Sequence, residues 1–258
     1  MDCMWIKEVK LMNSNMKIYL NNLMMPIPSG VEYVRDYRDE QKWISSDSKM
    51  SIPGKKGNLI EIERKIQIKS FLLAKYPVTK SLYEVIFHKL KDNVGDNSMP
   101  MVNISWYDAI LFCNLLSKEC GLNEYYTFEQ KGGKVFCDWN ADGYRLPTDA
   151  EWQYACKATS TGYRYGEIGD IAWYCENSDG NIHEAGKKQA NNWGLYDMLG
   201  NIWEWCWDLY DEKTYGQYRI FRGGSWAEQA RGCGATCRRR GHPSFGIDDL
   251  GFRLAKSF

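Results

Sequence analysis

Three short motifs rich in glycine and tryptophan stand in the last third of this chain of 258 residues. In order, they are Gly194–Asp208 (GLYDMLGNIWEWCWD), Arg222–Trp226 (RGGSW) and Gly251–Arg253 (GFR). Beyond residue 162 the sequence has almost no helical periodicity. Glycines permit tight turns, and large aromatic side chains can fill a core between irregular segments. The motifs therefore predict loops and short strands packed around tryptophans, in the α+β class.

The first half of the chain carries the predicted regular structure. Alternating apolar and polar residues predict strands over 25–34 and 59–69, separated by an exposed loop over 35–57. Helices are predicted to begin after Thr79, Ser105 and Thr148, each of which can cap a helix. Residues 1–24 are polar and rich in methionine, so we expect a poorly determined N-terminal segment ahead of one domain over 25–258.

Charge and cysteine usage narrow the classes of function. The formal net charge is +0, which argues against a nucleic-acid partner. The nine cysteines are irregularly spaced and include no Cys-x-x-Cys pair. No apolar run in the sequence suits a signal peptide or a membrane span. We therefore expect a cytoplasmic protein with no membrane partner, whose reduced cysteines are mostly core residues.

Further motifs precede the three at the C-terminal end and complete an ordered set. They are Tyr76–Thr79, Pro100–Ala109, Tyr144–Ala155, Asn191–Met198, Gly200–Trp205, Arg222–Trp226 and Gly251–Arg253. The set resembles the formylglycine-generating enzyme family, also called the sulfatase-modifying factor family, from about residue 25 to residue 254. The resemblance implies a C-type-lectin-like α+β fold with a small mixed sheet, two or three helices and much irregular structure.

The same resemblance implies one structural calcium site. Its ligands would be the side chains of Asp197 and Glu204 and the carbonyl oxygens of Gly200 and Ile202. Carboxylate and carbonyl oxygens at short spacing are the ligands that calcium prefers. The alternative is that Glu204 pairs with an arginine in a loop without metal.

Active members of the family hold copper(I) with two cysteines after the Gly-Gly-Ser motif, and thiolates suit that ion. In this chain the second position is Cys233, the residue that would serve catalysis, whereas the first is Glu228. A carboxylate is a poor ligand for copper(I), so one half of the pair is missing from the pattern. Cys237 could replace it from the other side, or Cys233 could be a core thiol.

The segment from residue 226 to residue 249 is the candidate ligand-binding surface. Its predicted ligand-binding residues are Trp226, Glu228, Arg231, Arg238, Arg240, His242, Phe245 and Asp248. Mixed arginine, aromatic and carboxylate side chains on an irregular backbone suit recognition of a peptide, protein or small molecule. The resemblance extends to the variable proteins of diversity-generating retroelements, in which this segment is diversified. The alternative is a solvated arginine face, or arginines that anchor neighbouring loops.

Two functions follow from these patterns. The first is a binding module that keeps the scaffold and lacks the copper cysteine pair. The second is an oxygen-dependent oxidase that converts a cysteine of a target protein to formylglycine, with Cys233 as a copper ligand. Fold alone does not decide between them.

Overall fold

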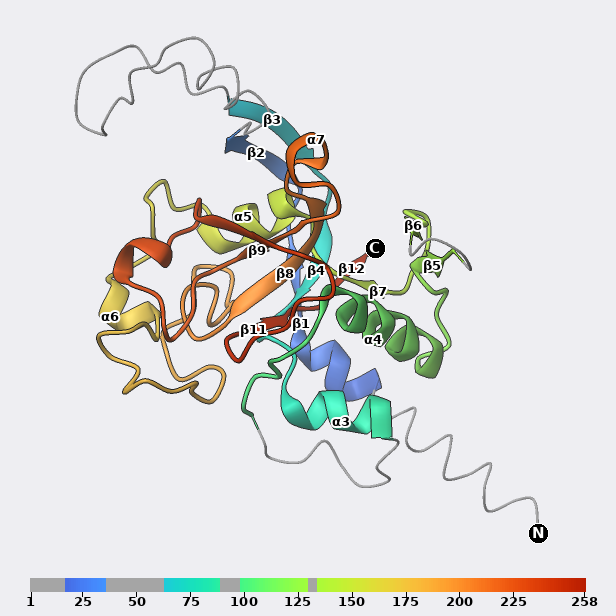
Figure 1. Ribbon diagram of the computed structural model, residues 1–258, viewed down its shortest axis with the longest axis horizontal. Coiled ribbons are helices and arrows are strands. Elements are labelled where there is room, and N and C mark those ends of the chain that lie inside the picture. The colour runs from blue at the N-terminus through green and yellow to red at the C-terminus, as the bar shows by residue number, and fades with distance from the viewer. Residues whose placement is uncertain (1–16, 36–62, 89–97, 130–133) are drawn as a thin grey trace.

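Two four-stranded sheets organise the protein (Figure 1). The computed structural model describes residues 17–35, 63–88, 98–129 and 134–258. The first sheet has the order β1-β4-β12-β7, with strands Met24–Ile27, Phe71–Ala74, Ala255–Ser257 and Tyr144–Arg145. The second has the order β10-β9-β8-β11, with strands Arg238–Gly241, Arg219–Arg222, Trp203–Leu209 and Leu250–Phe252. Both sheets join strands distant in sequence, so the C-terminal motifs close the fold.

Two hairpin-like pairs complete the strands. They are β2 with β3 (Gly30–Arg35 and Glu63–Ile68) and β5 with β6 (Tyr126–Phe128 and Val135–Cys137), both antiparallel. Within the second sheet, β8 pairs antiparallel with β9 and parallel with β11, so this sheet is mixed as predicted. The strands predicted over 25–34 and 59–69 are confirmed where the chain is described, as β1, β2 and β3.

Three helices exceed two turns in the described part of the chain. They are α3 (Lys80–His88), α4 (Trp106–Glu119) and α5 (Asp149–Lys157), and each begins where the sequence predicted. Ser105 and Thr148 each form a capping box with the acidic residue three positions later. The short helices α6 (Ile168–Ile171), α7 (Glu212–Tyr215) and η2 (Ala230–Gly232) are single turns within the irregular C-terminal part.

One part of the expected N-terminal segment is ordered. Residues 17–23 form a helix ahead of β1, and Leu20 and Leu23 are buried in the core. Sequence patterning did not predict this helix, because two apolar residues among polar neighbours make a weak stripe. Residues 1–16 and 36–57, the latter in the predicted exposed loop, lie outside the described residues.

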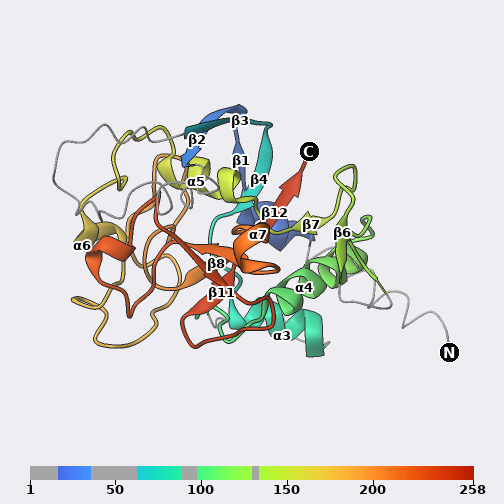
Figure 2. The same cartoon turned by 45° about the horizontal axis from the view of Figure 1, so that its top comes forward.

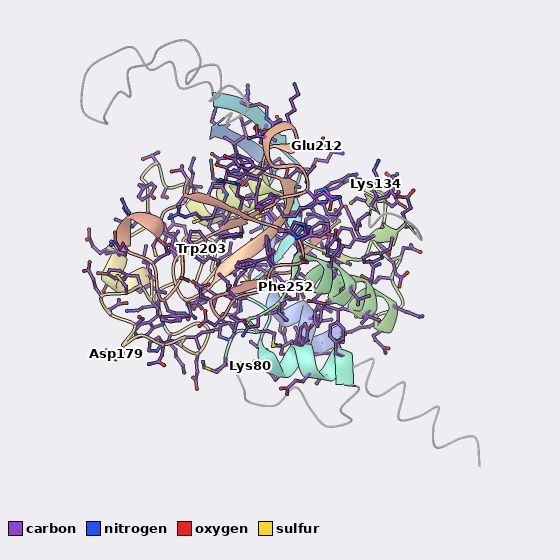
Figure 3. The ribbon with its side chains drawn as sticks, viewed as in Figure 1. Lys80, Lys134, Asp179, Trp203, Glu212 and Phe252 are labelled. Atoms are coloured by element: carbon purple, nitrogen blue, oxygen red, sulfur yellow. The ribbon has the colours of Figure 1, made fainter. Side chains whose placement is uncertain are left out.

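The first four residues of β8, a middle strand of the mixed sheet, are buried, and helices α5 and α4 lie near this strand (Figure 2). Helix α5 packs against β8 and β9 on one face, while α4 is tied to the other face through two indole N–H groups. Trp106 donates to the carbonyl of Cys206 at 2.9 Å, and Trp205 donates to the carbonyl of Ile104 at 2.8 Å. Trp203 and Phe252 lie near the centre of the view in Figure 3, whereas Glu212 and Lys134 lie at its periphery. Tryptophans therefore fill the core and bond irregular segments together.

Neither α4 nor any other described helix combines the length and the apolar character needed to span a bilayer.

Candidate functional site

The predicted calcium ligand Glu204 is engaged by protein groups. Its carboxylate lies on β8, is fully buried, and forms an ion pair with Arg253, with 2.7 Å between Oε1 and the guanidinium Nη2. Trp152 of α5 donates its indole N–H to Oε2 at 2.8 Å. Arg253 also donates to the carbonyls of Ala74, Lys75 and Tyr196. This is the arrangement that the alternative interpretation of Glu204 described, in which the carboxylate pairs with an arginine.

Asp197 has an unmet acceptor atom. Its Oδ2 accepts from the amide of Gly186 at 2.6 Å, while the buried Oδ1 has no hydrogen-bond partner among the described residues. Burial raises the pKa of Asp197 to about 6, although the Gly186 amide and the positive charge of Arg253 oppose the shift. A buried acceptor without a donor is costly, and a bound cation would relieve that cost.

The backbone around these carboxylates needs a glycine. Gly200 has φ +72, and a Cβ there would lie 2.3 Å from the carbonyl oxygen of Trp173.

The described residues contain no group of three or more His, Cys, Asp or Glu side chains that could hold a metal. A calcium ion would therefore depend on Asp197 and on backbone oxygens such as those of Gly200 and Ile202. The residues fit calcium on the Asp197 side, and the site stays a prediction.

A second polar centre lies after the Gly-Gly-Ser motif. Ser225 donates to Asp249 Oδ2 at 2.6 Å and accepts from the amide of Ala227. Asp249 Oδ1 and the indole N–H of Trp226 are both buried without a hydrogen-bond partner among the described residues. Burial raises the pKa of Asp249, with the charges of Asp248 and Glu228 adding to the effect. The acceptor Asp249 Oδ1 and the donor Trp226 N–H therefore lack hydrogen-bond partners, and the Ser225 hydroxyl links the two segments that carry them.

Cys233 lies directly behind this centre. Its side chain is fully buried, and a Cβ added to Gly224 would lie 2.6 Å from its Sγ. Burial, together with the nearby carboxylate of Glu228, raises the pKa of the Cys233 thiol to about 12. Glu228 leans over Gly232, whose added Cβ would lie 2.2 Å from Oε2. The environment therefore favours the protonated thiol, which is a weaker metal ligand than the thiolate.

Strand β10 divides the predicted ligand-binding residues between two faces of the sheet. Neighbouring residues of a strand point to opposite faces. Arg238 and Arg240 lie over the ring of Tyr210, with Arg238 held by Asp149 at 3.3 Å. Arg239, between them, contacts Glu228 at 3.7 Å.

The remaining predicted ligand-binding residues follow the same division. His242 contacts the ring of Tyr218, and Phe245 lies near Gly241 on the Arg239 face. Arg231 and Asp248 are exposed. The structure therefore brings Glu228 beside the Ser225–Asp249 centre and places Arg238, Arg240 and His242 elsewhere. The sequence could not show this, because side-chain direction in β10 depends on its register with β9.

Ser225, Tyr210 and Tyr215 were not predicted to bind ligand, and Asp249 was predicted only as part of the surface over 226–249. Asp249 lies directly before β11, and its neighbour Asp248 is the residue predicted to bind ligand. The alternation of buried and exposed residues at the start of β11 could have distinguished the buried Asp249 from the exposed Asp248. The two tyrosines lie in a segment without a motif.

Most cysteines are core residues, as expected. Five of the eight described cysteines are buried, Cys137 and Cys237 are half-buried, and Cys175 is exposed; none of the eight forms a disulfide. Burial raises the pKa of the Cys237 thiol too. Cys175 donates its amide to the carbonyl of Glu228 at 3.0 Å, so the exposed thiol is close to the Ser225–Asp249 centre.

The fold and these loops define a C-type-lectin-like α+β domain of the formylglycine-generating type. The family described as the sulfatase-modifying factor enzyme 1-like domain matches residues 23–258. The chain therefore belongs to this family, and the resemblance drawn from the motifs is confirmed.

Three similar proteins show the range of the family. The solved structure of Treponema denticola variable protein 1 is 29% identical, with a TM-score of 0.74 over 91% of this chain and 95% of that one. Chaperone protein LppX of Paenibacillus barcinonensis is 28% identical over 64% of this chain and 72% of its own length. Inactive C-alpha-formylglycine-generating enzyme 2 of Mus musculus is 29% identical over 62% of this chain. The match spans 49% of that mouse protein.

Proposed function

We propose that this chain is a binding module that recognises a peptide, protein or small molecule through the loops from Trp226 to Asp249. The proposal rests on one observation above all. The Trp226 N–H and the Asp249 Oδ1 are a buried donor and a buried acceptor, both unmet, on segments joined by Ser225. Both atoms are buried, so a ligand with a matching acceptor and donor would satisfy them once the loops that cover them move aside.

The surroundings of the two atoms support recognition. Glu228 and Asp248 stand on loops that flank the centre, and the exposed Arg231 lies in the neighbouring single turn η2, so charges of both signs are present in this region. The loops are fixed from below by Arg222, which donates to Asp149 and to the carbonyls of Ala235 and Cys237. Such a rigid base lowers the ordering cost of binding.

Two of the similar proteins support a role without catalysis, although others carry the name formylglycine-generating enzyme. One is named a variable protein and another an inactive formylglycine-generating enzyme. The burial of Cys233 and its raised pKa oppose copper(I) binding, and Glu228 takes the position of the first copper cysteine. If the gene lies beside a reverse transcriptase and a near-copy of its own 3′ end, the segment over 226–249 is diversified.

The experiment is a selection of random peptides displayed on phage against the purified protein, followed by binding measurements on two variants. Trp226→Phe removes the N–H and keeps a smaller aromatic ring. Trp139→Phe is the matched control, since Trp139 is exposed far along the chain on the β6–β7 connection. We expect selected peptides to bind Trp226→Phe at least about tenfold more weakly and Trp139→Phe normally. Equal binding to both variants would show that the ligand lies elsewhere.

The oxidase alternative is tested on the same protein. Titration of the reduced chain with copper(I) against a competing chelator, with Cys233→Ser as the control, separates the two functions. We expect no tight binding that depends on Cys233. Tight one-to-one binding lost in the variant would overturn the proposal and make Cys233 a copper ligand, with Cys237 or Cys175 as the candidate partner.

We further propose that calcium binds at Asp197 and stabilises the loop that includes Gly200. The unmet Asp197 Oδ1 supports this proposal. Added calcium should then raise the unfolding temperature, and the rise should continue roughly with the logarithm of the calcium concentration above the dissociation constant; Asp197→Ala should abolish it. An unchanged unfolding temperature at millimolar calcium would contradict the proposal.

A further inference from the structure

The outer strand of the mixed sheet has one side without a partner strand. β10 pairs with β9, and no other strand within the described ranges pairs with it. In an antiparallel pair, alternate residues direct their N–H and C=O groups away from the neighbour. Half of the β10 backbone therefore faces outward, which is the template on which an extended peptide can add as a strand.

The edge is strongly basic. Three consecutive arginines occupy the first three positions of β10. Arg238 is held by Asp149 at 3.3 Å and is nearly buried. Arg239 is 53% exposed, and its contact with Glu228 is long, at 3.7 Å. Arg240 is exposed, and the described residues place no carboxylate within ion-pair distance of it. Two positive charges are therefore available to a partner.

Arg240 is also held in one orientation. Its guanidinium carbon lies 3.8 Å from the centre of the Tyr215 ring and 4.9 Å from that of Tyr210. The two rings contact each other edge to face at 5.5 Å between centroids. A guanidinium stacked on an aromatic face keeps its N–H edge free for a carboxylate and loses little side-chain entropy on binding.

We propose that β10 binds an extended acidic segment of another protein as an added strand, with two consecutive acidic residues opposite Arg239 and Arg240. The requirement for consecutive acidic residues comes from strand geometry. Residues directly opposite each other on neighbouring strands point to the same face, whereas Arg239 and Arg240 point to opposite faces. One acidic side chain thus meets each arginine, and charge complementarity selects this partner over a neutral strand.

The competing explanation is that the arginines only protect the edge. Charged residues on an outer strand prevent pairing between copies of a protein. In that case, removing the charges would cause self-association, and no acidic peptide would bind to the wild type.

The probe is a fluorescent peptide, Thr-Val-Thr-Glu-Glu-Thr-Val-Thr, followed by fluorescence polarisation. Two peptide controls are a Gln-Gln version and a set with N-methyl groups on alternate residues in both registers. The protein variants are Arg239→Gln and Arg240→Gln, and Lys187→Gln is the control, because it removes one exposed positive charge from another loop. Size-exclusion chromatography of each variant reports self-association.

We expect the Glu-Glu peptide to bind. The Gln-Gln peptide, and the N-methylated peptide whose methyl groups replace the N–H groups that face β10, should bind at least about tenfold more weakly. Each arginine variant should weaken binding about tenfold and Lys187→Gln should not. Absence of binding, or self-association of the arginine variants without peptide binding to the wild type, would overturn the proposal in favour of edge protection. Binding of both N-methylated peptides as tightly as the unmodified peptide, or equal binding of single-stranded DNA, would overturn strand addition in favour of a general anion surface.

This inference deepens the proposed binding function by naming a partner and a mode at β10. The two can fail separately, since Trp226→Phe leaves β10 intact and Arg240→Gln leaves the Ser225–Asp249 centre intact. If no selected peptide depends on Trp226 for binding, while the acidic peptide still binds and depends on Arg239 and Arg240, the first proposal alone is refuted.

Discussion

Removing Arg253 should be among the most damaging single changes in this protein. Its side chain and that of Glu204 have no exposed surface. Six hydrogen bonds leave its guanidinium, three to Glu204 and one each to the carbonyls of Ala74, Lys75 and Tyr196. Arg253→Met fills most of the volume and removes every donor. The carboxylate then keeps only the indole N–H of Trp152.

The expected loss follows from the groups that remain. A buried ion pair broken on one side costs about 3–5 kcal/mol, because the other charge is left uncompensated. Three carbonyls that lose their donor add to that cost. The free energy of unfolding of an ordinary domain is about 5–15 kcal/mol, so Arg253→Met should be close to the point at which the protein no longer folds. Glu204→Gln in the Arg253→Met background removes the stranded charge, so the double variant should be more stable than Arg253→Met.

Urea unfolding, followed by tryptophan fluorescence, measures the free energy of unfolding of Arg253→Met and of the double variant. Arg253→Lys is the informative milder change, since it keeps the charge and loses the planar fork of donors. A loss below about 1 kcal/mol in Arg253→Met would refute the reasoning. So would a double variant whose loss equals the sum of the two single losses, because residues in one network are not expected to act additively.

Three further predictions concern local features. Burial raises the pKa of Asp208 to about 6 from its ordinary 3.8, so the folded protein binds this proton more tightly than the unfolded chain does. The free energy of unfolding should therefore fall as pH rises between about 4 and 6, and urea unfolding of Asp208→Asn should show a flatter pH dependence. Thr148→Ala removes the cap of α5 and should cost about 1 kcal/mol, whereas Thr148→Ser should restore it; equal losses would contradict this. Gly224→Ala places a Cβ against the Cys233 Sγ and should lower the unfolding temperature more than Gly121→Ala, which shares a positive φ but has open space; equal shifts would show that only the backbone conformation matters.

The sequence determined the local structure of the first half and the family of the whole chain. Helices α4 and α5 begin at Ser105 and Thr148, because a capping box is a local interaction that is written in four residues. Alternation predicted β3, since one face of that strand is apolar. The ordered motifs identified the family, because all seven occur in the family's order and all but Tyr76–Thr79 contain a glycine or a tryptophan. The short helix over 17–23 escaped prediction, since its burial comes from distant parts of the core.

Only the tertiary structure decided what the candidate site residues contact. Glu204 and Arg253 are 49 positions apart in sequence, and their pairing depends on the parallel pairing of β8 with β11. Arg238, Arg239 and Arg240 are adjacent in sequence, yet the pairing of β10 with β9 sends the middle one to the opposite face. The unmet atoms of Asp197, Trp226 and Asp249 likewise appear only once all neighbouring segments are in place. Local sequence fixes backbone conformation, but hydrogen-bond partners and burial arise from segments that the sequence alone does not bring together.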